Sequence, residues 1–66
     1  MIITSPRYEF FGNIPVGATI EKWGARYTKV ADSEDTGCRW NCVTLDGAAS
    51  LWMWPEDAVL WHKAIA

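Results

Sequence analysis

Residues 38–54, CRWNCVTLDGAASLWMW, contain the strongest hairpin signal of the chain. Two runs rich in apolar and β-branched residues flank the pair Asp46-Gly47, which readily adopts the positive φ angles that a tight type I′ turn requires. The pattern predicts strands at residues 38–45 and 49–54, joined as an antiparallel hairpin. The hairpin in turn indicates that the chain is built mainly from β-strands.

Glycine and proline residues divide the remaining sequence into short segments, a spacing typical of strands and tight turns rather than helices. Further strands are predicted at residues 18–23, 26–31 and 58–62. The segment 32–37, which contains Asp32, Glu34 and Asp35, is predicted to be a solvated loop. Residues 1–13 are expected to form an N-terminal arm beside a β core of residues 14–62, with a short strand at residues 8–11 as the alternative for part of the arm.

The length of 66 residues indicates a single domain, residues 1–66. Short antiparallel strands joined by tight turns predict a mostly-β fold, a small SH3-like, partly open antiparallel barrel of about five short strands. An α+β fold with a short C-terminal helix is the alternative. That helix would begin at Pro55, with Glu56 and Asp57 in its first turn.

The five tryptophans are the most distinctive feature of the composition. Strand alternation places Trp52 and Trp54 on one face of their strand and Leu51 and Met53 on the other, so both faces are apolar. A two-residue hairpin loop would set Asn41 opposite Trp52, on the side of the sheet that also carries Arg39. A longer loop through Ala48-Ala49 would be expected to invert this register.

The tryptophans are expected to divide between the core and a contact surface, because so small a barrel cannot enclose five indole rings. The predicted core members are Trp23, Trp40 and Trp61. The candidate binding surface consists of Trp52, Trp54, Arg39 and Asn41, since exposed tryptophan beside arginine is typical of protein interfaces.

The sequence predicts no catalytic residue, metal site or cofactor, and the chain is not expected to be an enzyme. Cys38 and Cys42 would lie roughly 13 Å apart on a regular strand, whereas a disulfide requires Cα atoms within about 7 Å. Reduced cysteines are therefore expected, with a disulfide or a metal site as alternatives. His62 is the single histidine, and a structural zinc site needs four ligands.

The charge pattern argues against nucleic acid as the partner. The net charge is −2, and the six basic residues are scattered along the chain rather than clustered. No apolar run approaches the roughly 18 residues of a membrane-spanning helix, and the N-terminal residues lack the basic and apolar regions of a signal peptide. A cytoplasmic protein without membrane contact is expected.

Four short segments carry a resemblance to a known group of proteins: IPVG at 14–17, YTKV at 27–30, NCVTLDG at 41–47 and PED at 55–57. This series resembles short β proteins encoded by phages and prophages, which carry a Val-Gly-x-x-Phe opening, a Tyr-x-Lys-Val strand, an Asn-x-x-x-Leu strand and a closing Pro-Asp…Val. Ile20 stands where that pattern has phenylalanine. The resemblance implies a viral accessory protein in the host cytosol and brings no known site residues.

The predicted function is that of a non-enzymatic protein-binding module, a phage accessory protein that engages or inhibits a host protein or self-associates as a homo-oligomer. One alternative is an aromatic platform for a sugar, a modified peptide or single-stranded nucleic acid, because indole faces stack on rings and cations. A minor virion or assembly component is the other alternative.

Overall fold

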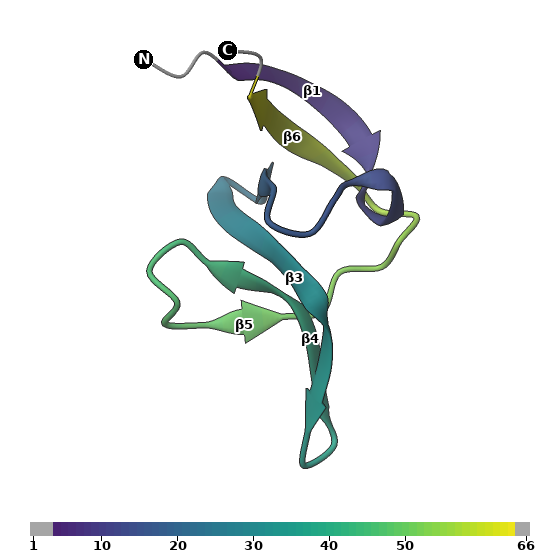
Figure 1. Ribbon diagram of the computed structural model, residues 1–66, viewed down its shortest axis with the longest axis vertical. Helices are drawn as coiled ribbons and strands as arrows, with labels where there is room; N and C mark the ends of the chain where they lie inside the picture. The colour runs from purple at the N-terminus through teal and green to yellow at the C-terminus, as the bar shows by residue number, and fades with distance from the viewer. Residues whose placement is uncertain (1–3, 65–66) are drawn as a thin grey trace.

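The computed structural model describes residues 4–64, which form one antiparallel sheet of six strands (Figure 1). The elements are β1 (Thr4–Phe10), the 3₁₀ helix η1 (Phe11–Asn13), β2 (Thr19–Lys22), β3 (Ala25–Asp35), β4 (Cys38–Thr44), β5 (Ser50–Leu51) and β6 (Ala58–Ala64). The strand order is β1-β6-β2-β3-β4-β5, and the edge strands β1 and β5 do not pair with each other. The expected mostly-β antiparallel fold is confirmed, with six strands in a sheet that is not closed into a barrel.

Strand β6 decides between the two folds considered for the C-terminal segment. It pairs with β1 from Phe10↔Ala58 to Thr4↔Ala64 and with β2 at Ile20↔Trp61. Residues 54–57 form the turn before it: the Asp57 amide donates to the Trp54 carbonyl at 3.0 Å. The alternative prediction of a C-terminal helix is therefore wrong. Val59 is buried in the core and Trp61, two residues later, packs against the same core, which is the alternation of a strand.

The N-terminal segment adds a strand at the sheet edge. Residues 4–10 of the expected arm form β1, which lies beside β6 in Figure 1. The helix η1 then carries the chain across the end of the sheet, where the Phe11 amide donates to the Asp57 carbonyl at 2.9 Å and the Gly12 amide to the Pro55 carbonyl at 2.9 Å. This crossing brings the N-terminal segment against the chain that follows Trp54.

The acidic segment 32–37 is not a loop, contrary to expectation. Strand β3 continues to Asp35, and β3 and β4 form a two-stranded ribbon that projects from the sheet (Figure 1). Its turn is Thr36-Gly37, with φ angles of 49° and 82°, the pattern of a type I′ turn. Glu34 lies directly opposite Arg39 across the two strands.

The core lies where η1, the sheet and the segment after β5 meet. Its members are Phe11, Ile14, Ile20, Cys42, Met53 and Val59, none of them more than 2% exposed. Trp61 packs against this cluster and Trp40 is half-buried. The prediction that Trp23 is a core residue is wrong: it is 70% exposed, because it occupies the turn between β2 and β3 rather than a strand.

Trp23 adopts a left-handed backbone conformation that is unfavourable for a residue with a large side chain. Its φ is 55° and that of Gly24 is 76°, so the two residues form a type I′ turn between the pair Lys22↔Ala25. Tryptophan rarely occupies the left-handed region, where its Cβ meets the carbonyl oxygen. The Lys22 ammonium lies 5.3 Å from the indole centroid and offsets part of this strain.

Replacing Trp23 with asparagine is expected to raise the free energy of unfolding by about 0.5–1 kcal/mol, because asparagine tolerates positive φ. Urea denaturation of the two proteins measures the difference. A decrease in stability would show that the Trp23 ring supports the fold through contacts that outweigh the backbone strain.

Candidate binding cleft

The hairpin of β4 and β5 has the register predicted from its sequence. Val43 pairs with Ser50 and Cys42 with Leu51. The connecting loop spans residues 45–48 rather than two residues: the Thr44 amide donates to the Ala49 carbonyl at 2.9 Å. The expectation that a longer loop would invert the register is therefore wrong. The loop is longer by two residues, one on each side of Asp46-Gly47, and such a change leaves every side chain on the predicted face.

The loop is fixed by the side chain of Asp46. Its Oδ1 accepts hydrogen bonds from the Thr44 hydroxyl at 2.6 Å and from the Ala48 amide at 2.9 Å. The Thr44 hydroxyl, followed by the Ala48 amide, lowers the pKa of the Asp46 carboxyl below its ordinary value. The hairpin therefore has a well-ordered end, which fixes how the chain enters β5.

Asn41 holds the chain where β5 ends. Its Nδ2 donates to the Met53 carbonyl at 2.8 Å, and its Oδ1 accepts from the Met53 amide at 2.8 Å. Both residues are buried, with Asn41 2% and Met53 0% exposed. The side-chain amide thus substitutes for a neighbouring strand at Met53 and fixes the backbone on which Trp52 and Trp54 are placed.

Trp52 and Trp54 form an aromatic pair at the surface. Their ring centroids are 6.0 Å apart and the rings are at 88°, an edge-to-face arrangement. The Arg39 guanidinium lies 4.3 Å from the centroid of Trp52, so Arg39 shares the side of the hairpin that the register predicts. Trp52 is half-buried, whereas Trp54 is 57% exposed.

A cleft of about 450 Å³ opens beside this pair. Its lining comes from β3, β4, η1 and the chain after β5: Phe11, Gly12, Lys29, Asp32, Arg39, Asn41, Trp52, Trp54 and Pro55. All four residues of the predicted surface are among them. We call this site the Trp52–Trp54 cleft.

The helix η1 supplies a wall of the cleft that the sequence did not predict. It can approach Pro55 closely because Gly12 has no side chain: a Cβ at Gly12 would lie 2.9 Å from the Cβ of Pro55. The residues are far apart in the sequence and show no shared pattern, so only the crossing of the chain reveals this wall.

Lys29 and Asp32 were also missed. Lys29 lies within the predicted strand 26–31, but its contact with the distant residues Phe11 and Ile14 has no local signal, and Asp32 was assigned to the predicted loop 32–37. The Lys29 ammonium donates to the carbonyls of Phe11 at 2.8 Å and Ile14 at 2.6 Å, so Lys29 holds η1 in place. Neither Arg39 nor Asp32 has an ion-pair partner within the described part of the chain. These two opposite charges are therefore available to a ligand.

The remaining reactive side chains lie elsewhere. Cys38 is exposed and Cys42 buried, and both are free thiols. Burial raises the pKa of the Cys42 thiol to about 11, although the Lys29 ammonium opposes the shift. Among residues 4–64, no three His, Cys, Asp or Glu side chains are grouped in a way that suits a metal ion.

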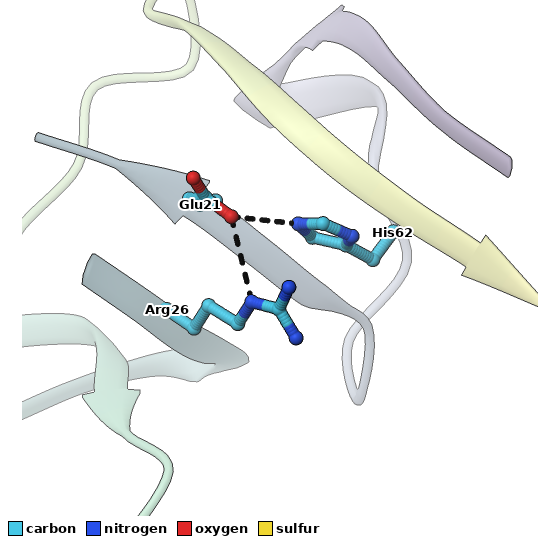
Figure 2. Close-up of polar contacts among 3 residues, drawn as sticks. All are labelled: Glu21, Arg26 and His62. Atoms are coloured by element: carbon cyan, nitrogen blue, oxygen red, sulfur yellow. Dashed lines mark hydrogen bonds and ion pairs between the residues drawn. The ribbon is translucent and has the colours of Figure 1, made fainter. Parts of the chain in front are cut away.

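His62 takes part in a polar cluster on the sheet, away from the cysteines. Its Nε2 lies 3.1 Å from Glu21 Oε1, and Arg26 Nε lies 3.4 Å from the same oxygen (Figure 2). The three residues come from the neighbouring strands β6, β2 and β3. No thiol or hydroxyl takes part in these contacts, so the cluster links strands and contains no nucleophile–base pair.

Comparison with known proteins does not assign the chain to a family. No family model matches the sequence, and neither a curated protein nor a solved structure matches the chain. No helix in the described residues has the length and apolar character needed to cross a membrane. Any inference about function therefore depends on the Trp52–Trp54 cleft itself.

Proposed function

We propose that the protein is a non-enzymatic protein-binding module and that the Trp52–Trp54 cleft is its contact surface. The observation that supports this most is the position of Trp54: a large apolar ring that is 57% exposed and adjoins a buried, doubly hydrogen-bonded residue, Met53. A pre-positioned ring loses little side-chain entropy on binding. Tryptophan and arginine are also the residues most enriched among interface hot spots.

The chemistry of the cleft suits a polypeptide partner. Apolar surface from Trp52, Trp54 and Pro55 would receive an apolar side chain, while Arg39 and Asp32 at the same cleft would pair with polar or charged groups. An apolar centre with a polar rim is the usual anatomy of a protein interface. In line with the resemblance to phage and prophage proteins, the partner would be a host protein met in the host cytosol.

An aromatic platform for a small ligand is the second candidate. The exposed ring of Trp54 favours it, because one free indole face is enough to stack on a sugar, a base or a cation. The guanidinium of Arg39 already covers one face of Trp52, and the two indoles are perpendicular. The cleft therefore offers no pair of parallel rings to enclose a flat ligand.

Affinity capture from a bacterial lysate tests the proposal. The wild-type protein and the variant Arg39→Glu serve as parallel baits, and the retained proteins are quantified by mass spectrometry. We expect a protein retained by the wild type to be lost with Arg39→Glu, because the variant reverses the charge at the cleft. The variant Lys63→Glu, with the same charge change at an exposed position of β6, should retain it. Equal retention by all three baits would contradict the proposed surface.

A further inference from the structure

The outer edge of β1 is free to pair with another strand. Among the residues that the structure describes, β1 pairs only with β6. The Phe11 amide donates to Asp57 across this ladder, and bonding alternates along a strand, so the amides of Arg7 and Glu9 face β6. The backbone groups of Pro6, Tyr8 and Phe10 consequently face outward.

This edge is partly protected in the single chain. Pro6 has no amide hydrogen, and the Phe10 amide donates to Oε1 of its neighbour Glu9 at 2.8 Å. This bond, followed by the one from Asn13, lowers the pKa of the Glu9 carboxyl. The central residue Tyr8 has an outward amide and carbonyl, and its side chain is 77% exposed.

The charges on either side of Tyr8 are complementary to those of a second, antiparallel copy. A two-fold axis at Tyr8 places Arg7 opposite Glu9 of the second copy, twice. These are non-hydrogen-bonded positions of the new ladder, where facing side chains approach most closely. Moving the axis by one residue would set Arg7 against Arg7 or Glu9 against Glu9. The sequence Arg7-Tyr8-Glu9 therefore favours one register over its neighbours.

We propose that two copies of this chain associate by pairing β1 with β1 about a two-fold axis at Tyr8, so that their sheets become continuous. In this register, each Tyr8 amide donates to the Tyr8 carbonyl of the other copy. Each Phe10 amide leaves Glu9 and donates to the Pro6 carbonyl opposite it. Pro6 has no amide hydrogen that would need an acceptor in the new ladder, so it is compatible with this pairing.

Exposed aromatic surface around the edge supports the same arrangement. Phe10 is 55% exposed and lies on the same face of β1 as Tyr8. A hollow of about 190 Å³ between them is lined by Tyr8, Glu9, Phe10 and Ala58. Tyr8 of the second copy, opposite Tyr8 and diagonal to Phe10, is within reach of this hollow. This association is independent of the Trp52–Trp54 cleft.

Sedimentation equilibrium from micromolar to millimolar protein tests the proposal. We expect a reversible monomer–dimer equilibrium for the wild type. Arg7→Glu and Glu9→Arg should each weaken dimerisation at least tenfold, because each replaces two attractions by two repulsions. The double variant Arg7→Glu with Glu9→Arg should restore the wild-type constant. Glu34→Arg, the same change on the ribbon of β3 and β4, should leave it unaltered.

A second variant separates edge pairing from other modes of association. Tyr8→Pro removes an outward amide without touching the β1–β6 hydrogen bonds, so it should give a monomer with an unchanged far-UV spectrum. A wild-type protein that stays monomeric throughout the concentration range would overturn the proposal. So would a double charge variant that fails to restore the dimer, since the register would then be different.

Discussion

Replacing Trp54 with alanine should lower the affinity for the captured partner at least 30-fold, equivalent to about 2 kcal/mol or more, the usual threshold of an interface hot spot. The physical reason is the loss of a large, exposed ring that lines the cleft and packs edge-to-face against Trp52. Isothermal titration calorimetry with the purified partner measures the change. The melting temperature should fall by less than about 4 °C, because surface substitutions usually alter stability by no more than about 0.5 kcal/mol.

The chain provides a matched control for this experiment. Trp23 is 70% exposed and does not line the Trp52–Trp54 cleft, so Trp23→Ala should bind the partner with wild-type affinity. Unchanged affinity in Trp54→Ala would contradict the proposed contact surface. Loss of the folded state in the same variant would show that the indole supports the core instead.

Replacing Asn41 with alanine should lower the free energy of unfolding by about 2–5 kcal/mol. The variant loses two hydrogen bonds of 2.8 Å and leaves the amide and carbonyl of buried Met53 without their side-chain partners. An unsatisfied buried polar group costs about 1–3 kcal/mol. Urea denaturation, read by far-UV circular dichroism, measures this loss.

Asn13→Ala is the corresponding control. Asn13 is exposed, and its Nδ2 donates only a long hydrogen bond of 3.3 Å to Glu9. The change should therefore cost no more than about 0.5 kcal/mol. If Asn41→Ala lowered the free energy of unfolding as little as this control, the two hydrogen bonds between Asn41 and Met53 would not be what positions the two tryptophans.

The parts of the fold that depend on local signals were predictable. The hairpin of β4 and β5 follows from the Asp46-Gly47 signal and the alternation around it, and its register fixes the side on which Arg39 and Trp52 meet. The predicted type I′ turn is wrong, because Asp46 lacks a positive φ and the loop has four residues. The predicted strand 49–54 is also shorter in the structure, where β5 ends at Leu51. The surface position of Trp54 also follows from this alternation, because both faces of its segment are apolar and only one can meet the core.

The errors have physical causes that a single sequence does not display. The acidic residues at 32–35 suggested a loop, but pairing with β4 and a type I′ turn at Thr36-Gly37 make them strand. Trp23 was assigned to the core from its side chain, although the turn geometry places it outside. The contact of Gly12 with Pro55 depends on long-range crossing of the chain.

Oxidative footprinting of the tryptophans, with and without the captured partner at equal protein concentration, tests whether the Trp52–Trp54 cleft is the contact surface. In the free protein, the two most exposed indoles, Trp23 and Trp54, should oxidise fastest, as read residue by residue in the mass spectrum. With saturating partner, Trp54 should be protected severalfold and Trp23 should react as before. Protection of Trp23 with Trp54 unchanged, or no protection of either, would show that the Trp52–Trp54 cleft is not the binding surface.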